Sequence, residues 1–269
     1  MYLDTVDRLA DTAAAKTAFL KRSPGGFFVS SMMAGAFIGL GIILIFCVGA
    51  DIDPAYRALI MGASFGIALT LVIFAGSDLF TGVTMFTTHG VLRRKIGIGD
   101  LGAAWTLCWL GNLAGAVVVV ALFMCGGGGA ALHSKSMIVM TAASAKMNAP
   151  VLSLLARAIL CNWLVCLAVW MCARTASDAA KCIIIFWCLF GFIGSGYEHS
   201  VANMTLLLIA LWGDHPDSIT WFGLAYNLFW VTLGNIVSGA GIMGVGYWYM
   251  SRPASVSAPV AAPAVNPAE

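Results

Sequence analysis

Charged residues are scarce in this sequence of 269 residues. Asp, Glu, Lys and Arg make up 10% of it, whereas a soluble globular domain carries about a quarter. Hydrophobic residues make up 61%, and several membrane spans are the ordinary explanation of such a composition. The formal net charge is only +2, and no basic run interleaved with aromatic residues occurs. The sequence therefore argues against a nucleic-acid partner.

Metal and cofactor motifs are also missing. The eight cysteines form no Cys-x-x-Cys pair, and all lie in or at the edge of apolar runs. We interpret them as small buried hydrophobic residues and predict no metal site and no cofactor. The one histidine deep in an apolar run, His199, has no companion histidine or clustered cysteines. A membrane enzyme would need such a cluster or a nucleophile–base pair, so we predict that the chain is not an enzyme.

The two ends of the chain differ from the middle. Residues 1–26 carry charges throughout, and Leu3, Val6 and Ala10 recur at helical spacing. They predict an amphipathic helix at the membrane surface, ended by Pro24-Gly25-Gly26. Residues 252–269 are rich in Pro and Ala and are predicted to form a disordered cytoplasmic tail.

The middle, residues 27–251, is predicted to be an all-α integral membrane domain with six transmembrane helices. A helix needs about 20 residues to cross the bilayer, and six apolar stretches are long enough: Phe27–Ala50, Ala58–Leu92, Leu101–Leu132, Met147–Ala173, Cys182–Gly213 and Ser218–Ser251. With the N-terminus in the cytoplasm, ten basic residues fall on that side and four on the other. This bias predicts that both termini are cytoplasmic.

Matching phrases suggest an internal repeat. "GSDLFTG" (76–82) in the second span is echoed by "GSGYEHS" (194–200) in the fifth, and "LGNLAGA" (110–116) in the third by "LGNIVSGA" (233–240) in the sixth. Three spans in each half place the halves in opposite orientation, so we predict an inverted 3+3 repeat with the transport path between the halves.

The second and fifth spans are predicted to be broken helices. Asp78 and Glu198 are the only acids in these spans, and each follows Gly and Ser residues. Irregular backbone at membrane depth persists only where it lines a cavity or is buried in protein. We expect both carboxylates to brace the broken backbone by accepting amide hydrogens. Glycine pairs four residues apart, such as Gly35/Gly39 and Gly111/Gly115, predict close helix packing.

Five phrases, "FAGSDLFTG", "GNLAGA", "LCNWLVCLAVW", "GYEHSVANM" and "GNIVSGA", resemble the formate/nitrite transporter family, most closely its nitrite channel branch. The resemblance runs from about Ala10 to Met250. It implies a homopentamer of aquaporin-like protomers in a bacterial inner membrane, each with its own pore for small anions of weak acids such as nitrite, formate and hydrosulfide.

The resemblance also assigns roles to residues. The central histidine matches His199, and Thr81, Asn162 and Lys146 match further residues of the pore and its anion site. An apolar constriction is implied for Leu79 and Phe80 and a second apolar gate for Phe192, with looser matches at Phe65 and Leu69. Asp78 and Glu198 are the remaining candidates, as the bracing acids expected from the sequence of the two breaks and not from the resemblance.

The chemistry of these residues suits a weak-acid anion. An apolar constriction strongly opposes an ion but opposes a neutral acid much less. A histidine between two constrictions can pair with the anion as an imidazolium and pass it a proton near neutral pH, so that transport is proton-coupled through His199. Thr81 can hydrogen-bond its ring, and Asn162 offers amide donors to an oxyanion. The alternatives are structural: Thr81 satisfies a broken carbonyl, Asn162 joins helices, and the apolar residues simply pack.

Nitrite is the leading substrate on this interpretation, with formate second and hydrosulfide third. A pore for a neutral solute, water or ammonia, is the alternative from another class. The sequence lacks the paired Asn-Pro-Ala motifs of an aquaporin. It also lacks two facing mid-membrane histidines, because His89, His133 and His215 fall at span ends or in loops, where we expect them to be solvated.

Overall fold

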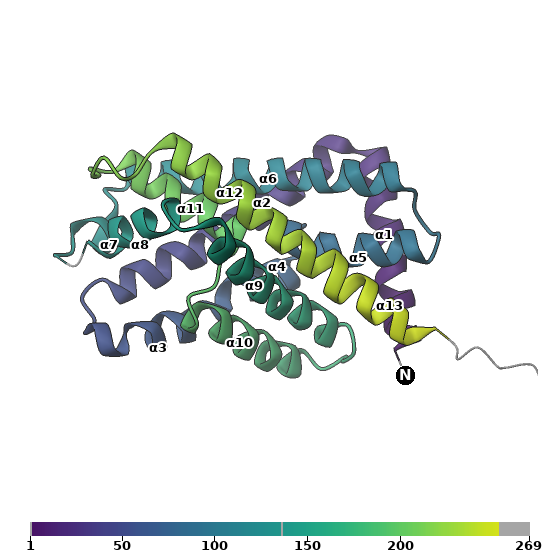
Figure 1. The fold of residues 1–269 in the computed structure, drawn as a ribbon. Coiled ribbons are helices and arrows are strands. Elements are labelled where there is room, and N and C mark those ends of the chain that lie inside the picture. The colour runs from purple at the N-terminus through teal and green to yellow at the C-terminus, as the bar shows by residue number, and fades with distance from the viewer. Residues whose placement is uncertain (1, 136, 253–269) are drawn as a thin grey trace, which may run out of the picture.

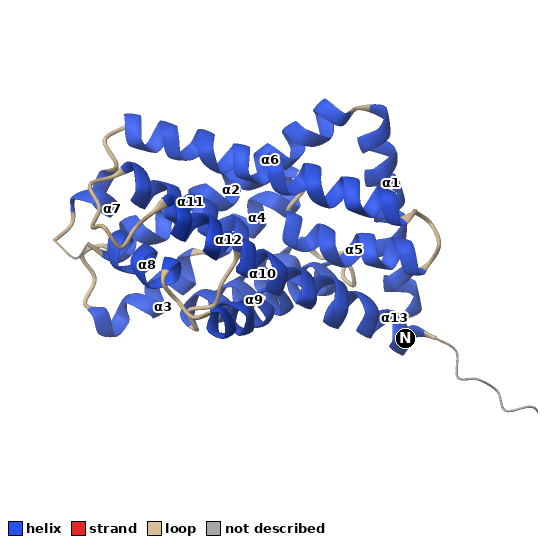
Figure 2. Ribbon diagram, turned by 45° about the horizontal axis from the view of Figure 1, so that its top comes forward, coloured by secondary structure: helices blue, strands red, loops and turns tan. Residues whose placement is uncertain are grey.

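The computed structural model describes residues 2–135 and 137–252, and every regular element in these ranges is a helix (Figures 1 and 2). The helices are α1 (Leu3–Arg22), α2 (Pro24–Gly49), α3 (Pro54–Ser64), α4 (Gly66–Ala75), α5 (Phe80–Leu92), α6 (Ile98–Cys125), α7 (Gly129–His133), α8 (Ile138–Met147), α9 (Val151–Cys172), α10 (Asp178–Gly194), α11 (Ser200–Trp212), α12 (Trp221–Ile236), the π-helix η1 (Val237–Val245) and α13 (Gly246–Ser251). The predicted tail, apart from Arg252, lies outside the described residues.

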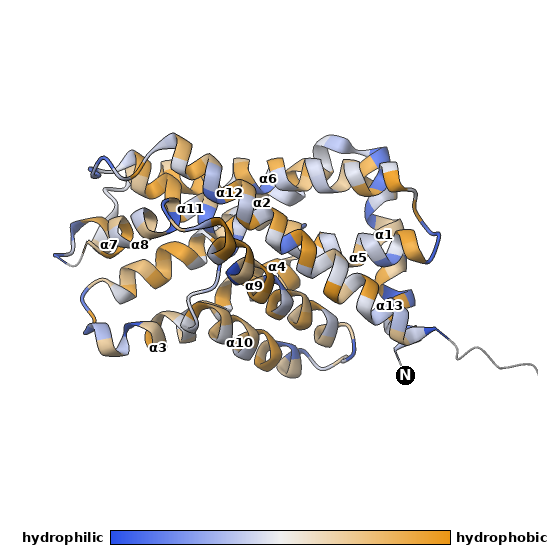
Figure 3. Cartoon of the chain, viewed as in Figure 1, coloured by the Kyte–Doolittle hydropathy of each residue, from blue (hydrophilic) through white to orange (hydrophobic). Residues whose placement is uncertain are grey.

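Long apolar helices dominate the described ranges. Five helical runs are long and apolar enough to cross a membrane: Pro24–Gly49, Pro54–Ala75, Ile98–Cys125, Val151–Cys172 and Trp221–Ser251. Figure 3 shows apolar residues along most of their length and hydrophilic residues gathered toward the ends of the bundle. The stretch Cys182–Gly213, predicted as one further span, is divided between α10 and α11.

The predicted N-terminal helix is present as α1, but its boundary differs from the expectation. The helix ends at Arg22, and Ser23 caps the next helix by accepting a hydrogen bond from the Gly26 amide at 3.3 Å. Pro24 therefore occupies the first turn of α2, where its missing amide hydrogen costs nothing. Val6, Leu9 and Ala13 are buried, and α1 packs against α5.

The end of the bundle that carries α1 is rich in basic residues. Figure 1 places the N-terminus and α13 at this end. The loop after α5 is joined to α1 by an ion pair between Arg93 Nε and Asp7 Oδ1 at 2.6 Å, and by a second one between Lys95 and Asp11. These contacts hold α1 across the end of the bundle.

Helices α2 and α6 approach closely, as their glycines predicted. A Cβ atom at Gly35 would lie 2.0 Å from the Asn112 carbonyl oxygen, and one at Gly115 would lie 1.9 Å from that of Met32. Only glycine fits at either position. This packing confirms the small-residue pattern and brings Asn112 against α2.

Both predicted helix interruptions are present. Helix α4 ends at Ala75, Gly76 takes a φ of +76°, and α5 begins at Phe80. Helix α10 ends at Gly194, Gly196 takes a φ of +69°, and α11 begins at Ser200. A positive φ favours glycine because a Cβ atom makes it strained. The glycines of the two phrases thus allow the backbone to leave one helix and start another.

Two expectations about side-chain burial are wrong. Five of the eight cysteines are buried, but Cys125 and Cys182 are exposed on the surface of the chain. His89 was expected to be solvated and is instead fully buried, with its ring 5.8 Å from that of Trp170. The position of His89 in the last turn of α5 suggested a span end, but α1 covers that turn.

Candidate functional site

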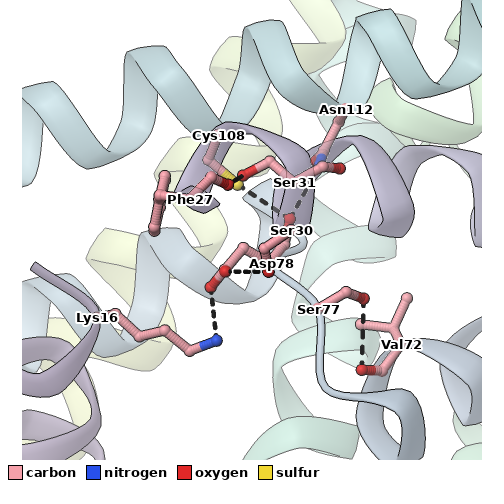
Figure 4. A network of polar contacts seen from close by, with 9 residues as sticks. All are labelled: Lys16, Phe27, Ser30, Ser31, Val72, Ser77, Asp78, Cys108 and Asn112. Carbon is pink, nitrogen blue, oxygen red and sulfur yellow. Dashed lines mark hydrogen bonds and ion pairs between the residues drawn. The ribbon is translucent and has the colours of Figure 1, made fainter. Parts of the chain in front are cut away.

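The break between α4 and α5 is held by side chains from three other helices (Figure 4). The Asp78 carboxylate, only 1% exposed, pairs with Lys16 Nζ of α1 at 2.8 Å and accepts a hydrogen bond from Ser30 Oγ of α2 at 2.6 Å. Asn112 of α6 binds the backbone: its Nδ2 donates to the Asp78 carbonyl at 2.9 Å, and its Oδ1 accepts from the Phe80 amide at 2.9 Å. The same Nδ2 donates to the Ser31 carbonyl at 2.7 Å.

The break between α10 and α11 has the same construction. The Glu198 carboxylate pairs with Lys146 Nζ at 2.9 Å and accepts from Asn203 Nδ2 at 2.6 Å. Asn235 of α12 donates to the Glu198 carbonyl at 3.1 Å and to the Ala158 carbonyl at 2.9 Å, and its Oδ1 accepts from the Ser200 amide at 2.9 Å. Each break therefore combines one acid, one lysine and one asparagine that binds the broken backbone, and Asn203 is a second asparagine at the break between α10 and α11.

The acids do not have the role expected of them. Within the described residues, neither carboxylate accepts a backbone amide hydrogen, and both are used by a lysine and by a neutral side chain. The asparagines brace the backbone instead. An amide side chain carries both donor and acceptor, so it can bind a free carbonyl and a free N–H at once, whereas a carboxylate can only accept.

Three of these residues, Lys16, Asn112 and Asn235, were not identified from the sequence as functional. The signal for the asparagines was present, because both occupy the same place in the repeated Leu-Gly-Asn phrase. The signal for Lys16 was weaker. A buried carboxylate needs a cation nearby, so each half of the repeat requires one. Lys16, however, lies on an N-terminal helix outside the repeated phrases.

His199 lies where the two short helices α5 and α11 begin. It is 3% exposed and caps α11, since its Nδ1 accepts a hydrogen bond from the Ala202 amide at 3.1 Å. Its Nε2 lies 3.1 Å from Thr81 Oγ1, which confirms the expected bond between these residues. Because Nδ1 is an acceptor, the ring is neutral with its hydrogen on Nε2, and this hydrogen points to Thr81.

Two cavities meet at His199. One, of about 120 Å³, is also lined by Lys146, Tyr197 and Asn203. The other has a volume of only about 10 Å³, at the lower limit for one water molecule. Four of the predicted constriction residues line the smaller cavity, in company with Ile38, Val165 and Leu189; they are Phe65, Leu69, Leu79 and Phe192. Phe192 lines both cavities and stacks on the imidazole, with ring centroids 5.8 Å apart.

Phe80 and Asn162 lie away from these two cavities. Phe80 faces a separate groove between α6 and α12. Asn162 Nδ2 donates to the carbonyls of Thr81 at 3.3 Å and Asn235 at 2.7 Å. The structure therefore places Asn162 as a link between helices, the alternative that the sequence left open, because both its amide hydrogens are already used.

The electrostatics at His199 favour a small anion. The N-terminus of a helix carries a partial positive charge, and α5 and α11 both begin beside the Thr81–His199 bond. Lys146 adds a cation to the wall of the larger cavity, although its charge is shared with Glu198. In the described part of the chain, no three His, Cys, Asp or Glu side chains are grouped so that they could hold a metal ion.

A sequence profile of the formate/nitrite transporters matches residues 3–249. The chain belongs to the formate/nitrite transporter family. Membership in this family, together with the long apolar helices, makes the chain a multi-pass membrane transport protein and not an enzyme.

Relatives within the family cover nearly the whole chain. The nitrite transporter NirC of Escherichia coli (strain K12) is 52% identical over 255 residues, covering 95% of this chain and 94% of that protein. An "FNT family ion channel" of known structure matches with a TM-score of 0.90 at 53% identity, covering 93% of this chain and 99% of that one. A "pentameric formate channel with formate bound" matches with a TM-score of 0.71 at 27% identity, covering 86% and 98%.

Proposed function

We propose that this protein is a channel for small monovalent anions of weak acids and that nitrite is its main substrate. The observation that carries the proposal is the Thr81–His199 pair, which lies between a cavity lined by Lys146 and a closed apolar constriction. The 52% identity to a nitrite transporter favours nitrite. Formate is the second candidate, because a family member of related structure has formate bound.

The architecture we infer is six transmembrane spans arranged as an inverted 3+3 repeat. The support is the match between the two breaks, where Asn112 and Asn235 bind equivalent backbone groups. The channel domain begins with α2 at Pro24 and runs to residue 251, and α1 (Leu3–Arg22) covers one end of it. The basic residues around α1 support an orientation with both termini in the cytoplasm of a bacterial inner membrane.

A homopentamer is the assembly that we propose, in which each protomer carries its own pore. The support is the structural similarity to a formate channel that is itself pentameric. The protomer alone already contains both cavities and the Thr81–His199 pair. Transport therefore needs no residue from a second copy in the site itself.

In the mechanism we propose, one set of groups attracts the anion and another controls its passage. Lys146 and the two helix N-termini draw an anion into the larger cavity. The constriction formed by Leu79, Phe192 and their neighbours then opposes a bare ion, because desolvation costs several kcal/mol or more. A weak-acid anion that gains a proton passes as a neutral molecule, and chloride, the anion of a strong acid, does not.

His199 takes part in this mechanism as a neutral hydrogen-bonding group. A second proton on the ring would have to bind Nδ1, and this would break the hydrogen bond from the Ala202 amide. The Nε2 hydrogen and the Thr81 hydroxyl are the groups that can bind an acid or anion at the constriction. The proton that accompanies the anion then comes from the solution and not from a charged histidine.

The test is anion flux into proteoliposomes, with nitrite, formate and chloride compared over a range of pH. We expect nitrite to move fastest, chloride to be excluded, and nitrite flux to rise as the pH falls. If nitrite enters no faster than into protein-free vesicles while water or ammonia does, the protein is a neutral-solute pore and the proposal is wrong.

A further inference from the structure

The backbone carbonyl of Thr81 accepts hydrogen bonds from three side chains. Thr84 Oγ1 donates to it at 2.7 Å, Asn162 Nδ2 at 3.3 Å and Cys166 Sγ at 3.4 Å. Thr84 is on α5 itself, and the other two residues are on α9. All three are fully buried, and none of them lines either cavity at His199. They do not meet a permeating anion directly, and Thr81 is the residue that all three contact.

The sixth apolar stretch leaves room for this cluster. A Cβ atom at Gly239 of the π-helix η1 would lie 2.1 Å from Thr84 Oγ1 and 2.8 Å from Asn162 Nδ2. Both distances are too short for a real contact, so only glycine fits where the backbone comes this close. Helices α5 and α9 and the π-helix therefore meet around the Thr81 carbonyl.

The cluster also acts on the constriction. The Thr81 carbonyl and the Gly82 N–H belong to one planar peptide group, and this N–H donates to the Leu79 carbonyl at 3.1 Å. Donors at one end of a peptide group polarise the other end, so the bond to Leu79 is strengthened. Leu79 lines the smaller cavity, and Thr81 Oγ1 lies 3.1 Å from His199 Nε2. One peptide group thus helps to place both a constriction residue and the hydroxyl that meets His199.

The half of the repeat without Thr81 lacks such a cluster. The contacts at the breaks equate Ser31 of α2 with Ala158 of α9, because Asn112 and Asn235 donate to their carbonyls, and they equate the first residues of α5 and α11 in the same way. Steps of one and two turns along α9, and of one turn along α5, lead to the residues of the cluster. The same steps along α2 and α11 lead to Gly35, Gly39 and Met204. None of these three side chains has a hydrogen to donate, so a break of this construction forms without the cluster.

We propose that Thr84, Asn162 and Cys166 are positioning residues for transport, which hold the Thr81 hydroxyl against His199 and Leu79 in the constriction. The inference rests on the proposed anion channel, in which this hydroxyl and this constriction decide what passes. When the cluster is weakened, the hydroxyl leaves the imidazole part of the time and the constriction closes less completely. Nitrite then crosses more slowly and chloride more easily.

Thr84→Val tests the proposal, because valine has nearly the shape of threonine and lacks the hydroxyl. We expect the ratio of nitrite flux to chloride flux in proteoliposomes to fall about fivefold, the effect of losing one hydrogen bond. Thr84→Ser keeps the hydroxyl and should retain the wild-type ratio. If Thr84→Val yields no folded protein, Cys166→Ala is the second variant, with a fall of about twofold because the thiol is a weak donor.

Thr88→Val is the matched control. Thr88 Oγ1 makes the same kind of bond on the same helix, 2.7 Å to the Thr84 carbonyl, but one turn further from His199. Its loss should leave the flux ratio unchanged. An equal fall for Thr88→Val and Thr84→Val would overturn the proposal, because the effect would then be a general weakening of α5.

A readout that does not depend on transport is the ¹⁵N signal of His199 Nε2, in the full chain labelled at its 4 histidines. Thr84→Val should shift this signal in the same direction as Thr81→Val, and Thr88→Val should leave it in place. An unshifted signal, or a shifted signal with an unchanged flux ratio, would contradict the positioning role. A shifted signal in a protein that conducts no small anion would instead show that the positioning is real and the proposed channel function is wrong.

Discussion

His199 uses its two ring nitrogens for two separate tasks. Nδ1 caps α11 through the Ala202 amide, and Nε2 meets Thr81 across the site. The first task is structural, and in the mechanism we propose the second concerns the permeating molecule. A substitution that preserves the cap and removes the ring separates them.

Asparagine is that substitution, because it is among the best helix N-caps. We predict that His199→Asn folds and assembles normally but lowers nitrite flux by about tenfold, the effect of losing a hydrogen bond worth roughly 1.4 kcal/mol at the rate-limiting point. Selectivity over chloride should also fall, whereas the pH dependence of flux should stay the same, because in the proposed mechanism the proton comes from the solution and not from His199. The measurement is proteoliposome flux over a range of pH.

His133→Asn is the matched control for this prediction, since His133 is an exposed residue at the end of α7. It should leave flux and its pH dependence unchanged. An unchanged nitrite flux for His199→Asn would reduce the role of His199 to capping.

The residues of the site differ in how well the sequence alone predicts their place in it. The resemblance to the family identified His199, Thr81 and the constriction residues Leu79 and Phe192, and the structure brings all four together. Phe80 was assigned to the same constriction, but its side chain faces the opposite way. Adjacent residues at the start of a helix point in different directions, and a motif does not say which of them faces the pore.

At the scale of the elements, each helix break depends on an ion pair that is largely shielded from water. Lys16→Met should leave the Asp78 carboxylate buried without a cation, at a cost on the order of 3 kcal/mol. We predict a clear fall in the thermal unfolding midpoint of the purified protein. Adding Asp78→Asn should restore most of the lost stability, because the charge that needed Lys16 is then gone.

Lys21→Met is the control for this prediction. Lys21 also pairs with an acid, Asp100, at 2.7 Å, but its side chain is 66% exposed. Exposed ion pairs contribute little to stability, so the unfolding midpoint should hardly move. Equal losses for Lys16→Met and Lys21→Met would show that burial of Asp78 is not the cause.

The contact of α2 with α6 gives a second prediction at this scale. A side chain at Gly115 would meet the Met32 carbonyl of α2, so we expect Gly115→Val to prevent correct packing and to yield little folded protein. Gly102→Val on the same helix has open space around it and should be tolerated. Yield and monodispersity in size-exclusion chromatography are the measurements, and normal folding of Gly115→Val would contradict the close approach.

The breaks could be predicted from the sequence because their glycines and acids repeat at matching positions. Two other irregularities could not. Helix α3 gives way to α4 at Phe65, and the sixth apolar stretch contains the π-helix Val237–Val245. In this π-helix, a Cβ atom at Gly239 would lie 2.1 Å from Thr84 Oγ1 of α5. The distortion accompanies a tertiary contact, which no local sequence pattern encodes.

At the scale of the whole molecule, composition alone predicted a helical membrane protein. Scarce charge and long apolar stretches leave few other possibilities. The orientation in the membrane depends on weaker evidence, namely the bias of basic residues, and it can be tested directly.

We predict that the loop between α9 and α10 faces the cytoplasm and the loop between α11 and α12 faces the outside. Single cysteines at the exposed positions Ala176 and Asp217 report on these loops, in a background in which the exposed Cys125 and Cys182 are replaced by serine. A membrane-impermeant maleimide added to intact spheroplasts should label Asp217→Cys only. Labelling of Ala176→Cys alone would invert the proposed topology.

The two ion pairs at the breaks share an order along the chain that bears on biosynthesis. Lys16 precedes Asp78, and Lys146 precedes Glu198. Chains emerge from the ribosome N-terminus first, so each lysine has already been synthesised when its carboxylate reaches the membrane. The acid can be neutralised as its segment is inserted, and neither half has to carry an uncompensated charge into the lipid while it waits for the rest of the protein.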